Sequence, residues 1–212
     1  MIIMVVMIMK NDLYVLAHEV KNPLCVASGY LEMLNSNNID KYKAIIKEEI
    51  NNSLDILNSY LEYNKLIINK EDMDLNLLLI DVKKNMNDYL LKRGISLKID
   101  MIDDDIYLMG DYGKLKQVFY NIIKNSVESQ SKKIRISYQE LFGKLRIKIE
   151  NDGEKINNNN LSKIGNNYTN KNFGHGIGTT LSKKIIEMHN GKIIYKNNKK
   201  VGVSTIITLS LI

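Results

Sequence analysis

A histidine followed directly by a glutamate, His18-Glu19, is the first pair in this chain whose residue types suggest covalent chemistry. An imidazole is a nucleophile near pH 7, because its unperturbed pKa of about 6.5 leaves one ring nitrogen unprotonated. A neighbouring carboxylate can hold the other ring N–H and support the positive charge that develops on attack. The pair therefore predicts a nucleophilic histidine, with an ordinary surface histidine as the alternative.

Two further groups of residues have the composition of a site for phosphate and metal. Asn121 and Asn125 stand four apart, which places both amides on one face of a helix. Amide oxygens suit Mg²⁺, which otherwise keeps waters and phosphate oxygens. Gly174, Gly176 and Gly178 precede a predicted helix, so backbone N–H groups and the helix N-terminus can face an anion. Taken singly, these patterns are also those of solvated asparagines and a flexible turn.

The glycine-rich element departs from two common nucleotide motifs. Thr179 occupies the last glycine position of the dinucleotide fingerprint, and no βαβ pattern surrounds it. A Walker loop is excluded because no Gly-Lys-Ser/Thr sequence follows. A different kind of phosphate site is therefore expected.

The helix that must carry His18 is indicated by apolar residues at three-four spacing. They fall at Leu13, Leu16, Val20, Leu24, Ala27, Leu31 and Leu34, within a helix predicted over 12–35. In this heptad phase His18 faces solvent, and Pro23 predicts a bend just after it. A second helix is predicted over 41–68. Such a hairpin cannot bury its own apolar stripe, so we expect two hairpins to pair as a four-helix bundle.

The pattern becomes mixed α and β after a polar, acidic link at 69–74. Helices are predicted at 75–92, 114–128 and 178–189, a loop at 157–172, and strands at 95–99, 106–108, 133–138, 144–149, 192–196 and 203–211. We therefore expect an α+β chain of two domains, a helical hairpin over 1–70 and an α/β sandwich over 71–212.

Composition narrows the class of protein. The 212 residues carry a net charge of +6, but the lysines are scattered among acids, which argues against a nucleic-acid binder. The single cysteine, Cys25, excludes an internal disulfide and fits a reducing cytoplasm. The apolar start, residues 1–9, is shorter than the ~20 residues of a membrane span. We expect a cytoplasmic chain, with membrane contact through this short segment as the alternative.

These motifs resemble, in the same order, the boxes of two-component sensor histidine kinases. His-Glu-Val-Lys-Asn-Pro-Leu at 18–24 resembles the H box, and the segment around Asn121 and Asn125 resembles the N box. Residues 150–156 (Glu-Asn-Asp-Gly-Glu-Lys-Ile) resemble the G1 box, and 173–180 (Phe-Gly-His-Gly-Ile-Gly-Thr-Thr) the G2 box. The resemblance covers nearly the whole chain from about Leu13 onward.

The resemblance implies a fold and an activity. The fold is a dimerising helical hairpin followed by an α/β sandwich of the histidine kinase ATPase type. His18 is expected to be autophosphorylated from ATP with Mg²⁺, and to pass the phosphoryl group to an aspartate of a response-regulator receiver domain. Glu19 is expected to hold the second ring nitrogen, and Asn22 to help place water for dephosphorylation of the partner. The catalytic residues are thus His18, Glu19 and Asn22.

The resemblance also implies a set of nucleotide contacts, with Asn125 as the Mg²⁺ ligand. They are Asn121, Asn125, Asn151, Gly153, Gly174, His175, Gly176, Ile177, Gly178 and Thr179. His189, at the end of the following helix, is expected to be structural.

The G1 segment departs from the family pattern Asp-x-Gly-x-Gly. Asn151 replaces the aspartate that receives the adenine amino hydrogens, and Lys155 replaces the second glycine. An asparagine oxygen accepts a hydrogen bond, but a neutral bond is about half as strong as a charge-assisted one. Asp152 is a possible substitute after a shift of one residue. Two alternatives stay open: a phosphotransfer or scaffold protein with a degenerate nucleotide domain, and a clamp-type ATPase or Ser/Thr kinase of the wider superfamily.

Overall fold

The computed structural model describes residues 2–101, 105–161, 164 and 176–211, without the side chains of 2–13, 15, 160, 176 and 177. The chain forms two compact units, Met1–Lys65 and Leu66–Ile212. None of the helices within the described ranges combines the length and apolar character that crossing a membrane requires.

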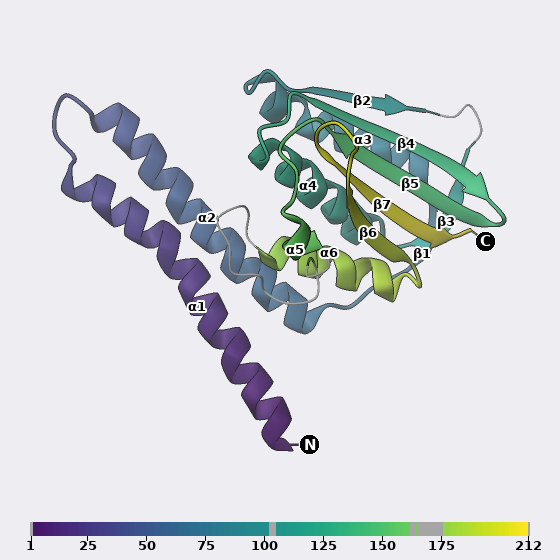
Figure 1. Cartoon of the computed structure of the whole chain (residues 1–212), viewed down its shortest axis with the longest axis horizontal. Helices are drawn as coiled ribbons and strands as arrows, with labels where there is room; N and C mark the ends of the chain where they lie inside the picture. Colours follow the sequence, from purple (N-terminus) through teal and green to yellow (C-terminus); the bar gives the residue numbers. More distant parts are fainter. Residues whose placement is uncertain (1, 102–104, 162–163, 165–175, 212) are drawn as a thin grey trace. The chain divides into compact units, whose positions relative to one another are not determined.

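The first unit is a hairpin of two long helices, α1 (Ile2–Glu32) and α2 (Ile39–Lys65) (Figure 1). α1 begins well before the predicted residue 12, because the apolar segment at the start of the chain continues the helix. It also runs without interruption through Pro23. In the connection between the helices, Asn38 accepts a hydrogen bond from the Asn35 N–H and donates one to the Met33 carbonyl, at 2.8 and 3.0 Å. These local bonds close the turn that reverses the chain.

Part of the apolar surface of the hairpin is buried between its own helices. Leu16, Ala27 and Ile56 are 2–6% exposed. Other large apolar residues of the two helices are exposed: Leu24, Leu31, Ile50, Leu54, Leu57 and Leu61. The four on α2 follow one another at three-four spacing and so form one stripe along that helix. A single hairpin therefore leaves an apolar stripe uncovered.

The second unit is built on a five-stranded sheet of order β2-β4-β5-β7-β6. Its strands are β2 (Ser96–Asp100), β4 (Lys133–Leu141), β5 (Lys144–Asn151), β6 (Lys192–Asn197) and β7 (Val203–Ser210). β2 pairs with β4 in parallel, and the other neighbours pair antiparallel. A separate antiparallel pair joins β1 (Glu71–Asp74) to β3 (Tyr107–Gly110). The sheet is therefore mixed.

Three helices, α3 (Leu75–Leu91), α4 (Tyr112–Glu128) and α6 (Gly176–Met188), cover one face of this sheet (Figure 1). The strand pattern explains why one face suffices: Leu145, Ile147 and Ile149 of β5 are at most 1% exposed, whereas Lys144 and Arg146 between them are exposed. Alternate residues of a strand point to opposite faces. The unit is thus a two-layer α/β sandwich with its core between the sheet and the helices.

Local capping fixes where these helices begin and end. The Asp74 side chain accepts from the Asn76 N–H at the start of α3, and Asp111 accepts from the Lys114 N–H at the start of α4. After α3 the chain turns at Gly94, whose φ of +66° suits glycine. A turn with positive φ also closes the β4–β5 hairpin, at Phe142 and Gly143.

The predicted α+β fold class is confirmed, and apart from the early start of α1 the helices and strands lie close to the predicted ranges. β1 was predicted as a link, because its acidic sequence Glu-Asp-Met-Asp shows no apolar alternation. In the predicted loop, residues 158–161 form the short helix α5 (Asn158–Leu161). Most of the remaining loop lies outside the described residues.

Candidate functional site

The His18 ring is exposed on α1, as the heptad phase predicts. The ring of Tyr14, one helical turn earlier, meets it edge to face with centroids 4.6 Å apart. This contact restricts the orientations of the imidazole and leaves the ring accessible to solvent. Asn22, the third predicted catalytic residue, lies one turn beyond His18 and is also exposed.

Glu19 differs from His18 in its environment. Its carboxylate oxygen Oε2 is buried and has no hydrogen-bond partner among the described residues. Burial raises the pKa of this carboxyl above its usual 4.5. A carboxylate that lacks a partner is free to receive an N–H donor, which is the role predicted for it beside the imidazole.

Asn121 lies between α4 and the first turns of α6. Its amide Nδ2 donates to the Gly178 carbonyl at 3.4 Å and to the Ser182 hydroxyl at 3.3 Å. The side chain is half-buried. Asn121 therefore holds the N-terminal end of α6 against α4, so the helix end that follows the glycine-rich element has a fixed position.

Asn125 lies one turn further along α4 and is half-buried. Within the described part of the chain its side-chain amide makes no hydrogen bond. Its position on the same helix face as Asn121 leaves an amide oxygen available beside the start of α6. That oxygen is a hard donor of the kind that Mg²⁺ accepts, so the residue present fits this ion.

The glycine-rich element is described in part. Gly174 and His175 lie outside the described residues. Gly176, Ile177 and Gly178 form the first turn of α6, and Thr179 follows half-buried. The thirteen residues of α6 are enough for the helix dipole to give its N-terminal end partial positive charge, as a phosphate site requires.

Asn151 ends β5 and is held by three hydrogen bonds. Its Oδ1 accepts from the backbone N–H groups of Gly153 and Val203, at 3.1 and 3.2 Å. Its Nδ2 donates to the Ser126 hydroxyl of α4 at 3.2 Å. The side chain thus connects β5, β7 and α4, which the sequence pattern did not indicate.

The residues that follow Asn151 make contacts that hold this loop in place. The Asp152 carboxylate accepts from the backbone N–H groups of Lys132 and Lys133, both at 2.8 Å. Burial works to raise the pKa of Asp152, but these backbone hydrogen bonds outweigh it and the pKa is lowered. Gly153 packs directly on the Ser129 carbonyl, where a Cβ would overlap it. Lys155 reaches the Lys199 carbonyl at 3.1 Å.

His189 is a residue whose partner the sequence did not reveal. It is 5% exposed, Nδ1 lies 2.7 Å from the Ile185 carbonyl, and Nε2 accepts from the Asp111 N–H at 2.8 Å. These partners fix the neutral ring with its hydrogen on Nδ1. His189 therefore links the end of α6 to the start of α4, the two helices that carry the predicted phosphate and metal residues.

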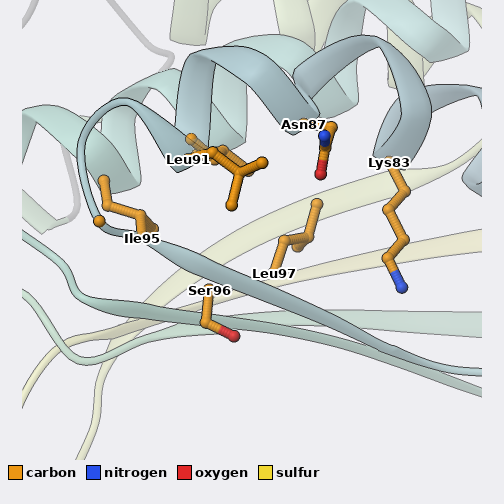
Figure 2. Close-up of a pocket in the computed structure, with 8 residues that line it drawn as sticks. Lys83, Asn87, Leu91, Ile95, Ser96 and Leu97 are labelled. Carbon is orange, nitrogen blue, oxygen red and sulfur yellow. The ribbon is translucent and has the colours of Figure 1, made fainter.

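A cavity of about 380 Å³ opens elsewhere, between α3 and the edge strand β2 (Figure 2). Lys83 and Leu91 lie on its α3 side, and Ile95 and Leu97 on the other (Figure 2). None of the eight residues that line it is a predicted site residue. The cavity is separate from the α4–α6 site.

An exposed histidine on a helical hairpin, with a helix N-terminus and an asparagine pair on a separate α/β sandwich, defines the catalytic core of a histidine kinase. Residues 12–67 match the family model of the His Kinase A (phospho-acceptor) domain. Residues 110–212 match that of the histidine kinase-, DNA gyrase B- and HSP90-like ATPases. The chain belongs to the two-component histidine kinases, as its motifs predict.

Individual relatives agree with this assignment. Sporulation kinase B of Bacillus subtilis (strain 168) is 30% identical in an alignment of 205 residues, which covers 91% of this chain and 47% of the relative. Sensor protein DegM of Bacillus sp. (strain B21-2) is 28% identical, and the match covers 92% of this chain and 53% of the relative. The chain thus spans about half the length of these curated relatives.

A solved structure is similar to this chain over both units. The histidine kinase ThkA, in a crystal structure with the response regulator protein TrrA, has a TM-score of 0.79 and 26% identity. The match covers 92% of this chain and 60% of that one. The hairpin and the sandwich are therefore those of a histidine kinase.

Proposed function

We propose that this chain autophosphorylates His18 from ATP and passes the phosphoryl group to an aspartate of a response-regulator receiver domain. The observation that carries the proposal is the exposed imidazole of His18 beside a carboxylate, Glu19, that has a buried oxygen without a partner in the described residues. We assign the phosphotransfer role to the hairpin, residues 1–70, and the nucleotide-binding role to residues 71–212.

In the proposed reaction the lone pair of one His18 ring nitrogen attacks the γ-phosphorus of ATP. The bond from that phosphorus to the bridging oxygen breaks, and ADP leaves with its electron pair. Glu19 accepts a hydrogen bond from the N–H on the other ring nitrogen and stabilises the positive charge of the phosphorylated ring. The protein contributes mainly positioning and charge, as phosphoryl transfer requires.

We assign the triphosphate to the end of α6 that Asn121 holds against α4. The backbone N–H groups of the first turn of α6, from Gly176 to Gly178, would face the phosphates, with Gly174, His175, Ile177 and Thr179 completing the glycine-rich element. Asn125 would hold Mg²⁺, which neutralises phosphate charge when bound. Asn151 and Gly153 would border the base. The hydrogen bonds of Asn121 and the amide oxygen of Asn125 support this assignment.

We further propose that the chain works as a homodimer in the cytoplasm. The exposed stripe Ile50, Leu54, Leu57 and Leu61 supports dimerisation, because pairing two hairpins would remove it from water. The receiver domain would dock on the hairpin near His18, where the exposed Asn22 would help to place a water for dephosphorylation. The complex of ThkA with TrrA supports a partner of this kind.

Calorimetric titration with Mg²⁺ and a non-hydrolysable ATP analogue tests the nucleotide half of this proposal. We expect saturable binding that weakens in an Asn125→Ala variant. A matched control is Asn85→Ala, an exposed asparagine on α3. A scaffold protein with a degenerate nucleotide domain would show no binding by the wild type, and that result would contradict the proposal.

A further inference from the structure

The amide of Asn151 has one possible orientation, because each of its partners has a fixed polarity. Oδ1 faces two backbone N–H groups, those of Gly153 and Val203, which donate and cannot accept. Turning the amide over would set its NH₂ group against both of these donors. The oxygen must therefore lie where the two N–H groups converge.

Ser126 fixes the other end of the amide. Its hydroxyl donates to the Ile122 carbonyl at 2.9 Å, which uses its single hydrogen. Toward Asn151 the Ser126 oxygen is therefore an acceptor, and the 3.2 Å contact requires an N–H from Nδ2. Three partners on α4, β7 and the following loop thus specify the same orientation.

Asn151 also has little freedom to move. The Asn198 side chain donates to its backbone carbonyl at 3.4 Å. Gly202, with a φ of +76°, packs so closely on the same carbonyl that an added Cβ would overlap it. The backbone of Asn151 is therefore held as well as its side chain, and we expect the amide to keep its orientation when a ligand approaches.

The side chain of Asn151 can still donate a hydrogen bond to a ligand, but its oxygen cannot accept another one. The two lone pairs of Oδ1 are both engaged, whereas one N–H of Nδ2 has no acceptor among the described residues. The residue is half-buried, so solvent reaches part of it, and this N–H is the hydrogen-bonding capacity that its side chain has left for a ligand. An aspartate in the same place would instead offer a second, charged oxygen as an acceptor.

We propose that Asn151 is a specificity-determining residue that makes the site accept 6-oxopurine nucleoside triphosphates at least as well as ATP. The inference rests on the proposed function, which brings the base beside Asn151. The 6-amino group of adenine is a donor and gains no hydrogen bond from the Asn151 N–H. The 6-oxo group of hypoxanthine or guanine is an acceptor and forms one.

Calorimetry with Mg²⁺ and non-hydrolysable analogues of ATP and ITP tests this inference, because the two bases differ at position 6 and in the proton on N1. For the wild type we expect a Kd for the ITP analogue equal to or below that for the ATP analogue. In Asn151→Asp the charged acceptor returns, and we expect a shift of about tenfold or more toward ATP.

The control is Asn157→Asp, which makes the same change of charge in the same loop. Asn157 is exposed and its Oδ1 accepts from the Asn159 N–H, a bond that aspartate keeps. We expect this variant to retain the wild-type ratio of the two dissociation constants.

The outcomes separate this inference from the proposed function. Tighter binding of the ATP analogue than of the ITP analogue by the wild type overturns the inference alone, as does an unchanged ratio in Asn151→Asp. Absence of binding by both nucleotides contradicts the proposed function, and the inference with it. If Asn151→Asp fails to fold, the wild-type ratio alone decides.

Discussion

The backbone N–H of Asp111 donates a 2.8 Å hydrogen bond to Nε2 of His189, and so joins the first residue before α4 to the residue that follows α6. Asp111 also caps α4 through its carboxylate. The Asn121 side chain joins the same two helices at the other end of α6. The two helices that we assign to the phosphates and the metal are therefore tied together at both ends of α6.

Protonation of His189 should weaken the α/β sandwich. Burial lowers the pKa of His189 below its usual 6.5, so the unfolded chain takes up this proton at a higher pH than the folded chain. The stabilisation is complete above about pH 6.5 and is lost as the pH falls below that value. Thermal unfolding between pH 7.5 and 5.5 should show a fall in Tm that is smaller in His189→Gln.

The exposed His18 supplies the control for this experiment. A His18→Gln variant leaves the Asp111–His189 bond intact, so its fall in Tm between pH 7.5 and 5.5 should be larger than that of His189→Gln. Parallel Tm profiles for wild type and His189→Gln would contradict the role of the Asp111–His189 bond.

Removing the charge of Glu19 should stabilise the hairpin and abolish phosphorylation of His18. Burial raises the pKa of Glu19, so the folded chain holds this proton more tightly and its stability falls as pH rises from about 4.5. We expect Glu19→Gln to raise Tm at pH 7, with the difference closing toward pH 4.5, and to lose phosphorylation of His18. Glu48→Gln, on the exposed surface of α2, should do neither. A lower Tm for Glu19→Gln would show that the carboxylate has a stabilising partner.

Gly202 should tolerate replacement least among the glycines of the sandwich whose surroundings are described. A methyl group there would overlap the Asn151 carbonyl, and the positive φ adds backbone strain. We expect Gly202→Ala to lower the free energy of unfolding by about 1–3 kcal/mol, measured by urea denaturation. In Gly113→Ala, where the nearest atom is 3.6 Å from the added Cβ, the gain in helix propensity should leave stability unchanged or higher. Equal stability of Gly202→Ala and wild type would contradict the close packing on Asn151.

Substitutions at Asn121 and Asn125 should affect nucleotide binding differently, because Asn121 positions α6 whereas Asn125 is the proposed metal ligand. Asn121→Ala removes two hydrogen bonds to α6, so nucleotide affinity should fall whether Mg²⁺ is present or absent. Asn125→Ala should weaken binding by about tenfold or more with Mg²⁺ and leave the metal-free affinity unchanged. Titrations with and without EDTA distinguish the two. An equal loss for Asn125→Ala in both conditions would contradict its assignment to the metal.

The periodicity of apolar residues was sufficient to predict both units and most of their elements. It placed His18 on the outer side of α1, because that position follows from the heptad phase alone. It missed β1, since Met73 is the one residue of Glu71–Asp74 that is buried and the strand is defined by its pairing with β3. Pairing over a long sequence separation leaves no mark on a short acidic segment.

The motif spacing predicts which residues border the nucleotide, and that assignment stays a prediction, but the spacing does not indicate how their polar atoms are used. The Asn151 amide is oriented by Val203 and Ser126, which lie far from it in the sequence. The expected structural role of His189 agrees with its buried ring, yet its partner Asp111 lies 78 residues away. Such contacts depend on the packing of α4, α6 and the sheet, which residue types alone do not specify.

Incubation with ATP labelled in the γ-phosphate tests the central claim most directly. The wild type should acquire label that is stable to alkali and released by acid, as phosphohistidine is, and His18→Ala should acquire none. His189→Gln, a histidine variant outside the proposed chemistry, should still be labelled. Equal labelling of wild type and His18→Ala, or label that survives acid, would contradict the assignment of His18 as the phosphoryl acceptor.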